Sequence, residues 1–197
     1  MFSQQGINME KTVEQIFSDS ITVKQETLKK NLSQIVGSAN AIIEAFQNKH
    51  KLFFCGNGGS AADSQHIAAE FVGRFQKERA AWPAIALTTD TSALTALGND
   101  YTFDIVFSRQ LEALGQKGDV LVAISTSGNS KNVLEAVKKA KILGIKTIGV
   151  TGGNGGQLAV LCDIAIVAAS AKTARIQESH LCIFHSICEL VENTLTK

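Results

Sequence analysis

The sequence predicts an α/β fold in which helices cover both faces of a parallel sheet. Short apolar runs alternate with longer segments of helical periodicity, as expected when parallel strands are joined by helices. Turns rich in glycine and serine follow two of these runs, and ligands of such folds bind at the carboxyl ends of the strands. With 197 residues, one proline and no low-complexity stretch, the chain is predicted to form a single domain over residues 1–197.

A long helical segment is predicted before the first strand. From Met9 to Lys49, apolar residues recur every three to four positions, which is helical spacing. Asn31 or Gly37 is expected to divide this length into two helices. Residues 1–50 form a large amphipathic segment, and packing against another subunit or against the chain's own sheet are equally open interpretations.

The rest of the chain alternates between predicted strands and predicted helices. Strands are predicted over residues 51–55, 84–87, 120–124, 147–150 and 164–167, and helices over residues 60–75, 103–114, 131–143 and 173–195. The loops that follow the first and third strands therefore lie at the edge of the sheet where ligands bind.

Composition and charge exclude several classes of partner. The formal net charge is +1, which gives no reason to expect nucleic acid or an acidic membrane as a partner. No run approaches the roughly 18 apolar residues that can span a membrane, and residues 1–5 do not begin a signal peptide. The four cysteines lack C-x-x-C spacing and lie mostly among apolar residues, so we expect buried, reduced thiols and a cytoplasmic protein.

Glycines follow the first predicted strand. Residues 56–61 have the sequence Gly-Asn-Gly-Gly-Ser-Ala, which fits the pattern G-x-G-x-x-A between a strand and a helix. A dinucleotide site is one interpretation, but Asp90 lies too far along the chain to be the acid that a ribose requires. A second interpretation is a loop whose amides, with the Ser60 hydroxyl, meet a sugar phosphate at a helix start. The simplest alternative is a tight turn that needs glycine.

Hydroxyl groups gather after the third predicted strand. Ser125, Thr126, Ser127 and Ser130 surround Gly128 between a buried strand and a predicted helix. Their O–H and N–H donors can surround a phosphate without a lysine, because the helix N-terminus supplies partial positive charge. The alternative is a helix N-cap, for which one hydroxyl would be enough. The pattern therefore favours a phosphate site.

Two side chains on the helix after the glycines can act on one ligand. His66 and Glu70 are four residues apart, so they share one face of a helix, one turn from each other. That spacing suits joint ligation of a metal ion or an acid–base pair on one substrate. A surface ion pair is at least as common with this spacing, and the position after the glycine loop is what favours a functional role.

Further polar residues lie on the last predicted helix or just before it. Gln177 and His185 are eight residues apart, which corresponds to about 12 Å of axial rise. They can reach one ion only if Gln177 lies near the helix start and both side chains lean inward; otherwise they serve different copies of the site in an oligomer. His185 could equally be a core histidine, and His180 is its rival for the same role, because spacing does not separate the two.

With these residues assembled, the chain closely resembles the phosphoheptose isomerases, which are sedoheptulose 7-phosphate isomerases of the sugar isomerase (SIS) superfamily. The resemblance covers nearly the whole chain. It is most specific in GNGGSAADSQHIAAEF at 56–71, ALTTDTSALTALGND at 86–100, ISTSGNS at 124–130 and RIQESHLCIFH at 175–185. The family implies a three-layer, flavodoxin-like SIS domain with a five-stranded parallel sheet. It also implies a homotetramer with active sites at subunit interfaces, to which the N-terminal helices of residues 1–50 contribute.

The resemblance implies roles for the residues that match the family's motifs. Glu70 and His185 would be the catalytic acid–base pair, and one zinc ion per subunit would bind His66, Glu70, Gln177 and His185. The family pattern selects His185 over His180. The sugar phosphate would contact Asn57, Gly58, Gly59, Ser60, Glu70, Arg74, Asn99, Asp100 and Gln177, with its 7-phosphate held by Ser125, Thr126, Ser127 and Ser130.

The implied reaction converts sedoheptulose 7-phosphate to D-glycero-D-manno-heptose 7-phosphate through an enediol. A carboxylate can take the carbon-bound proton, and a second group can move protons on oxygen or return one to carbon. Zinc would polarise the carbonyl and stabilise the enediolate. In the family this is the first step in making the ADP- or GDP-activated heptose of lipopolysaccharide core or another surface glycan.

Three other functions compete with this interpretation. The strongest rival is a non-enzymatic, tetrameric relative that binds the initiator of bacterial chromosome replication and lacks the full acid–base and metal set. This chain has His66, Glu70, Gln177 and His185 together, which favours the enzyme. A sugar-phosphate-sensing SIS module would accompany a further domain for which there is no spare length, and a nicotinamide enzyme is the least favoured alternative.

Overall fold

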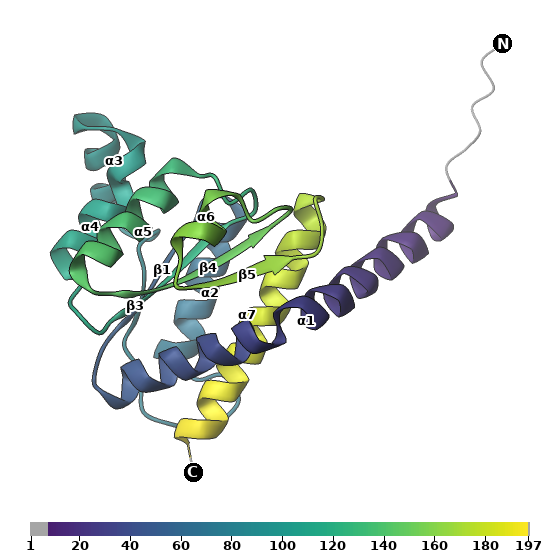
Figure 1. The fold of residues 1–197 in the computed structure, drawn as a ribbon, viewed down its shortest axis with the longest axis horizontal. Coiled ribbons are helices and arrows are strands. Elements are labelled where there is room, and N and C mark those ends of the chain that lie inside the picture. Colours follow the sequence, from purple (N-terminus) through teal and green to yellow (C-terminus); the bar gives the residue numbers. More distant parts are fainter. Residues whose placement is uncertain (1–7, 197) are drawn as a thin grey trace.

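The computed structural model describes residues 8–196 and confirms the predicted α/β architecture (Figure 1). Five parallel strands form one sheet in the order β2-β1-β3-β4-β5. This is the flavodoxin-like order, in which the direction of winding reverses between β1 and β3. The strands are β1 (Leu52–Cys55), β2 (Ala84–Ala86), β3 (Val120–Ser125), β4 (Lys146–Gly152) and β5 (Ile164–Ala168).

Helices form a layer on each face of the sheet (Figure 1). One layer holds α1 (Met9–Gln47), α2 (Gly59–Val72) and α7 (Thr173–Leu195), and the other holds α4 (Val106–Leu114), α5 (Lys131–Leu143) and α6 (Gly156–Leu161). The short helices α3 (Thr91–Asp100) and η1 (Phe103–Ile105) pack beside α4 and α5.

The apolar core consists of two clusters separated by the sheet. Phe54 and Val122 point toward α1, α2 and α7, whereas their neighbours Phe53 and Leu121 point toward α4 and α5. This alternation follows from the two-residue period of a strand. All four side chains are at most 3% exposed, so both faces of the central strands are buried, as a parallel sheet requires.

The prediction that Asn31 or Gly37 divides the N-terminal segment is wrong, because α1 is one helix of 39 residues. The Asn31 amide contacts the edge strand β5 instead of disrupting α1, accepting from the Val167 backbone amide and donating to its carbonyl, both at 3.0 Å. Gly37 has room for a methyl group, with Ile164 as its nearest neighbour at 3.8 Å. The N-terminal part of α1 extends beyond the body of the molecule (Figure 1).

Several predicted boundaries and elements also differ from the structure. Helices α3 and α6 were not predicted, the predicted helix over 60–75 ends at Val72, and the one over 103–114 begins with the 3₁₀ turn η1. Asp90 supplies the N-cap of α3, since its Oδ1 accepts from the Ala93 amide at 2.9 Å. Asp90 therefore has a structural role at the start of α3.

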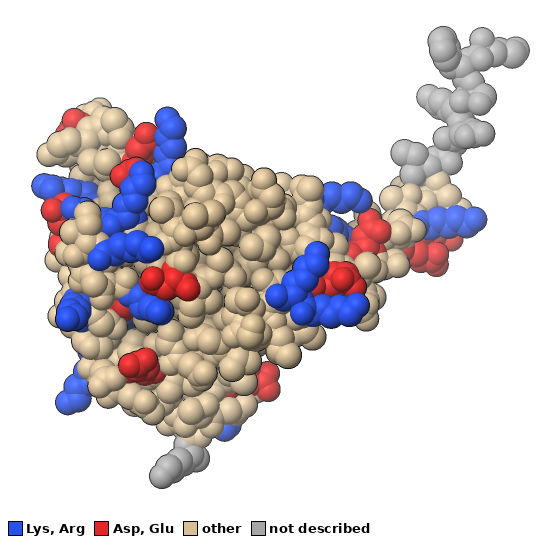
Figure 2. Space-filling model, in the orientation of Figure 1, with Lys and Arg blue, Asp and Glu red and all other residues tan. Residues whose placement is uncertain are grey.

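The surface and the cysteines only partly match the expectations from composition. Positive and negative side chains are interspersed on the face shown in Figure 2, and both occur on the protruding part of α1. Cys55 and Cys188 are buried and reduced, but Cys182 is exposed, so the expectation that all four thiols are buried is wrong. Within residues 8–196, no helix combines the length and apolar character needed to cross a bilayer.

Candidate active site

The glycine loop (residues 56–60) and the serine loop (residues 125–130) meet where the strand order reverses. Strands β1 and β3 are neighbours, with Cys55 paired to Ala123 at the end of their ladder. The two loops leave these strands at the same edge of the sheet, and helices α2 and α5 begin there. A ligand of an open parallel sheet binds in the crevice at this position.

Glycine is required in the glycine loop because the backbone is crowded. A Cβ on Gly56 would lie 2.7 Å from the backbone oxygen of Ser60, which cannot move away without disrupting the start of α2. Gly58 has φ of +55°, a conformation that favours glycine. A Cβ on Gly59 would overlap the side-chain amide of Gln177, so α7 meets the glycine loop at this point.

The serine loop directs its hydroxyl groups toward one another. The Oγ atom of Ser125 lies 2.9 Å from that of Ser130 and 3.5 Å from that of Ser127. Ser130 occupies the N-cap position of α5, but its side chain makes no capping hydrogen bond. This geometry argues against the N-cap alternative and leaves converging hydroxyls beside a helix N-terminus, where an anion is favoured. Thr126 is half-buried in the same loop.

A pair of amides joins the two loops. The Nδ2 of Asn57 donates to the Oδ1 of Asn132 at 2.9 Å, and the Nδ2 of Asn132 donates to the Oδ1 of Asn57 at 2.8 Å. Asn57 was predicted to contact the substrate, whereas Asn132, the second residue of α5, was not identified from the sequence. Its position two residues after the last serine of the loop is the only local signal that could have drawn attention to it.

His66, Glu70 and His185 form a cluster, termed here the triad, between α2 and α7. The His66 Nε2 lies 3.0 Å from the Glu70 Oε1, and the two imidazole rings have centroids 5.3 Å apart. One ligand atom from each of the three residues lies within 4.8 Å of the other two. Phe75 packs against the His185 ring at 5.5 Å. Two imidazoles and one carboxylate that converge in this way can hold a divalent cation or exchange protons with a substrate.

The structure separates the two rival histidines of α7. His180 is fully buried on the opposite side from the triad, and its Nε2–H donates to the Thr151 carbonyl at 2.9 Å. Burial lowers the pKa of His180 to about 4, although the bond to the Thr151 backbone opposes this shift. His180 is therefore a neutral core histidine at pH 7, whereas His185 is the histidine that meets His66 and Glu70.

Gln177 lies beside the glycine loop. Its amide lies against Gly59, the first residue of α2, whereas His66 is seven residues further along that helix. Seven residues correspond to about 10 Å of axial rise. The position of Gln177 next to the glycine loop suits the predicted substrate contact, and the predicted metal ligands His66, Glu70 and His185 form a cluster further along α2.

Three further predicted substrate residues are exposed and make local polar contacts in their own chain. Arg74 follows α2 and is exposed, with its Nε 3.7 Å from a Glu78 carboxylate oxygen. Asn99 donates to Asp100 at 2.9 Å, and both residues are exposed at the end of α3. Helix α3 packs against η1 and α4, in the layer opposite the triad.

A buried ion pair, termed here the Arg79–Glu192 clamp, fixes the end of α2 against α7. Glu192 accepts from the backbone amides of residues 75–77 and from the Arg79 Nε at 3.1 Å. Arg79 also donates to the Glu70 carbonyl at 2.7 Å. Burial raises the pKa of Glu192, but these hydrogen bonds outweigh it and the pKa lies below its usual range. The clamp therefore supports both Glu70 and the segment that carries Phe75, and spacing in the sequence gives no sign of it.

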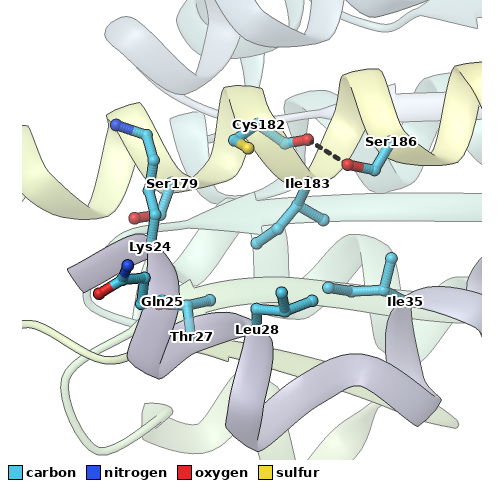
Figure 3. A pocket seen from close by; sticks show the side chains of 9 residues that line it. All are labelled: Lys24, Gln25, Thr27, Leu28, Ile35, Ser179, Cys182, Ile183 and Ser186. Atoms are coloured by element: carbon cyan, nitrogen blue, oxygen red, sulfur yellow. Dashed lines mark hydrogen bonds between the residues drawn. The ribbon is translucent and has the colours of Figure 1, made fainter. Parts of the chain in front are cut away.

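A separate pocket of about 230 Å³ lies between α1 and α7 (Figure 3). Both helices contribute polar and apolar side chains to it, with Leu28 and Ile35 of α1 and Ile183 of α7 as the large apolar ones. It uses a different face of α7 from the one that carries His185. The residues around it are Lys24, Gln25, Thr27, Leu28, Ile35, Ser179, Cys182, Ile183 and Ser186.

Comparison with known proteins shows what the chain is similar to. The profile of the SIS domain matches residues 16–152. A phosphoheptose isomerase of Nitratiruptor is 61% identical over 152 residues, which cover 77% of this chain and 81% of the relative. A phosphoheptose isomerase of Campylobacter concisus is 52% identical over 90% of this chain and 95% of its own length.

A solved structure shares the same fold and arrangement. The phosphoheptose isomerase GmhA from Neisseria gonorrhoeae is 46% identical and superposes with a TM-score of 0.89. The alignment covers 94% of this chain and all of that structure. The similarity therefore extends over nearly the whole chain.

Proposed function

This chain belongs to the phosphoheptose isomerases of the SIS-domain family, and on that premise we propose which of its residues isomerise sedoheptulose 7-phosphate. The reaction interconverts a ketose and an aldose, and its product is D-glycero-D-manno-heptose 7-phosphate. The triad is the observation that carries the assignment of catalytic residues, because it brings a carboxylate and two imidazoles from α2 and α7 together.

The substrate is proposed to span the two loops. Its phosphate binds the hydroxyls of Ser125, Ser127 and Ser130, with Thr126 beside them, at the N-terminus of α5. Its sugar lies toward Asn57, Gly58, Gly59 and Ser60, where the Gln177 amide is also present. This division gives the charged end and the hydroxyl-bearing end of the sugar phosphate separate sets of donors.

Proton transfer is assigned to Glu70 and His185. The Glu70 carboxylate takes the proton from the carbon next to the carbonyl and returns it to the neighbouring carbon. The His185 imidazole moves a proton between the two oxygens of the enediol, because an imidazole can donate and accept near neutral pH. Glu70 is about one-fifth exposed, so a substrate can reach its carboxylate.

The triad also fits a divalent metal ion. Two nitrogen donors and one oxygen donor with an open position are the ligand set of many catalytic zinc sites. His66, Glu70 and His185 would hold the ion, and Gln177, whose amide lies against Gly59, is the fourth predicted ligand. When bound, zinc would supply polarisation of the substrate carbonyl and of the negative charge that develops there.

Assembly into a homotetramer with active sites at subunit interfaces is proposed from two observations. Arg74, Asn99 and Asp100 are exposed and make polar contacts only with sequence neighbours in the described residues, so they are free to complete the site of a neighbouring chain. Helix α1 also exposes a series of large apolar side chains, and such a surface marks a protein contact. These are Met9, Val13, Ile16, Phe17, Ile21, Leu28, Leu32 and Val36.

The assembled enzyme is proposed to work in the cytoplasm, where its four cysteines would stay reduced, as they are in the structure. The alternative of a non-enzymatic partner of the replication initiator is not favoured. The relatives at 61% and 52% identity are isomerases, and the chain has the complete triad.

Isomerisation of sedoheptulose 7-phosphate by the wild type, before and after chelation, tests this assignment together with Glu70→Gln and His185→Gln. Each substitution is expected to lower kcat by at least about a hundredfold, as for loss of a general acid or base. Both replace a partly exposed side chain by one of similar size, so the melting temperature should change little.

Chelation separates the metal from the acid–base pair. Loss of turnover on chelation, with recovery when zinc is added, is expected if the triad holds a catalytic ion. If chelation leaves turnover unchanged and both variants are inactive, the metal has no part in catalysis and the acid–base pair is retained. Wild-type activity in either variant would refute the catalytic role of that residue.

A further inference from the structure

We propose that Asn132 is a positioning residue, which sets the distance between the glycine loop and the serine loop by holding the side chain of Asn57. The inference rests on the proposed function, because it concerns a substrate that spans both loops. Asn132 is 4% exposed, so it acts on the substrate through Asn57.

The two side chains determine each other's orientation. Each amide donates one hydrogen bond to the other and accepts one in return, at 2.9 and 2.8 Å. A side-chain amide has two N–H groups and an oxygen with two lone pairs. Asn57 therefore retains one N–H and one lone pair for a ligand, and the reciprocal pair fixes the plane in which these remaining groups lie.

Asn132 is itself held by the helix that follows the serine loop. Its Oδ1 also accepts from the Val133 backbone amide at 3.0 Å, which is one of the N–H groups left unpaired at the start of α5. Its backbone is the second residue of α5, two positions after Ser130. The position of Asn57 is thereby tied to the helix N-terminus proposed to receive the phosphate.

Loss of this link affects the two ends of the substrate differently. The serine loop is positioned by β3 and α5, so it can still receive a phosphate. The glycine loop loses the tie between Asn57 and that site, so that a sugar phosphate held at one loop no longer meets the other at the correct distance. Recognition of the complete substrate should weaken while recognition of inorganic phosphate should not.

Asn132→Ser is the principal variant. A serine hydroxyl can still accept from an amide at the start of α5, but it is too short to reach Asn57. We expect kcat/KM for sedoheptulose 7-phosphate to fall about tenfold, the effect of losing one or two buried hydrogen bonds. The inhibition constant of inorganic phosphate should stay within about twofold of the wild-type value, because no donor of the serine loop is removed.

A double-mutant cycle tests whether Asn132 acts through Asn57. If it does, Asn57→Ala combined with Asn132→Ser should be no worse than Asn57→Ala alone, because the second change removes a contact that is already lost. Independent effects that multiply would overturn the proposal. An unchanged kcat/KM in Asn132→Ser, or an equal loss of affinity for inorganic phosphate, would overturn it as well.

Thr147→Val is the matched control. Thr147 is also fully buried and donates to Asp163 at 2.7 Å, but it lies at the amino end of β4, away from both loops. It should lower the melting temperature without changing kcat/KM. Asn132→Ala, which loses both contacts, should lower the melting temperature more than Asn132→Ser.

Wild-type turnover distinguishes failure of this inference from failure of the proposed function. If the wild type turns over and Asn132→Ser matches it, only the positioning role is wrong. If the wild type binds sedoheptulose 7-phosphate by calorimetry without turning it over, the proposed catalysis is wrong. The same calorimetric titration of Asn132→Ser then decides the positioning role, which requires about tenfold weaker binding of the sugar phosphate.

Discussion

At the scale of single residues, Gly59 determines where the Gln177 amide can lie. Replacing Gly59 by alanine adds a methyl group that overlaps this amide. The flexible Gln177 side chain can move, and alanine favours a helix more than glycine does, so the fold should be retained. We expect kcat/KM to fall ten- to hundredfold, since small displacements of a positioning group have effects of about that size.

Steady-state kinetics, with the melting temperature as the measure of folding, checks the Gly59→Ala prediction. Gly37→Ala is the control, because it adds the same methyl group where the nearest neighbour is at 3.8 Å. A fully active Gly59→Ala enzyme would show that the position of the Gln177 amide does not matter for the reaction.

His180 predicts a loss of stability in mildly acidic solution. Burial holds its folded-state pKa at about 4, whereas an unfolded histidine titrates near 6.5. The unfolded chain therefore binds the additional proton first, and stability present above pH 6.5 is lost as the pH falls toward 4. Between pH 7 and pH 5 this loss amounts to roughly 2 kcal/mol for the one site.

Denaturant unfolding at pH 7 and pH 5 measures this loss in the wild type and in His180→Gln, whose amide can still donate to Thr151. The wild type should lose more free energy of unfolding than the variant over this interval. Glu192 does not interfere, because its depressed pKa makes its contribution disappear only at lower pH. Equal losses in both proteins would mean that His180 is not buried as a neutral group.

The sequence was sufficient for some residues of the site and insufficient for others, for physical reasons. The i, i+4 rule places His66 and Glu70 together, because both lie on one helix. The choice between His180 and His185 depends on how α7 is rotated against β4, and this is set by packing. Asn132 contacts Asn57, which is 75 positions away in the sequence, and Arg79 contacts Glu192, which is 113 positions away. No local sequence pattern encodes contacts over such separations.

At the scale of elements, the continuity of α1 leads to a prediction for Gly37. This residue lies inside the helix, is half-buried and has room for a methyl group. Gly37→Ala should therefore raise the free energy of unfolding by about 0.5–1 kcal/mol, the difference in helix propensity. Denaturant unfolding at a fixed protein concentration measures it, and a destabilised variant would show that α1 needs a weak point at Gly37.

The two helices that were not predicted from the sequence are α3, which has no buried residue, and α6, which is short. The apolar pattern of α3 is short, with only Leu94 and Leu97 packed against the core. Helix α6 has six residues, less than two turns, and follows a glycine-rich turn. The five strands were predicted correctly in number because each is a short apolar run, and β1, β3 and β4 are buried along nearly their whole length.

At the scale of the whole molecule, the exposed apolar side chains of α1 predict the assembly state. Leu32→Asp places a charge within this surface, where Leu32 is 58% exposed in the single chain. Burying that charge in an interface without a partner is costly. Light scattering should therefore show a wild type near four times the chain mass of 21.0 kDa and a smaller species for the variant.

Val160→Asp is the control for the assembly prediction. Val160 is 85% exposed, but it lies on α6 in the other helical layer, so its substitution should leave the mass unchanged. The Leu32→Asp species should also lose activity if Asn99 and Asp100 act on a neighbouring chain's loops. A monomeric wild type with full activity would contradict both the assembly and the shared site.

The sequence determines the overall topology better than it determines the assembly. Alternating strands and helices restrict a chain of this length to a few sheet orders, and the glycine and serine loops mark the strands at the crevice. The amphipathic pattern of α1 does not determine what packs against its apolar face, because contact with β5 and contact with another subunit require the same periodicity. Only the exposure of its N-terminal half separates the two.

Helix α7 restricts which insertions and deletions the sequence can tolerate. Along its length it meets the glycine loop at Gln177, the sheet at His180, the triad at His185 and the clamp at Glu192. Each side chain can be exchanged by itself, but an inserted or deleted residue turns everything beyond it by about 100°. The number of residues between Gln177 and Glu192 is therefore fixed more strictly than their identities, and length variation among active relatives should fall outside this interval.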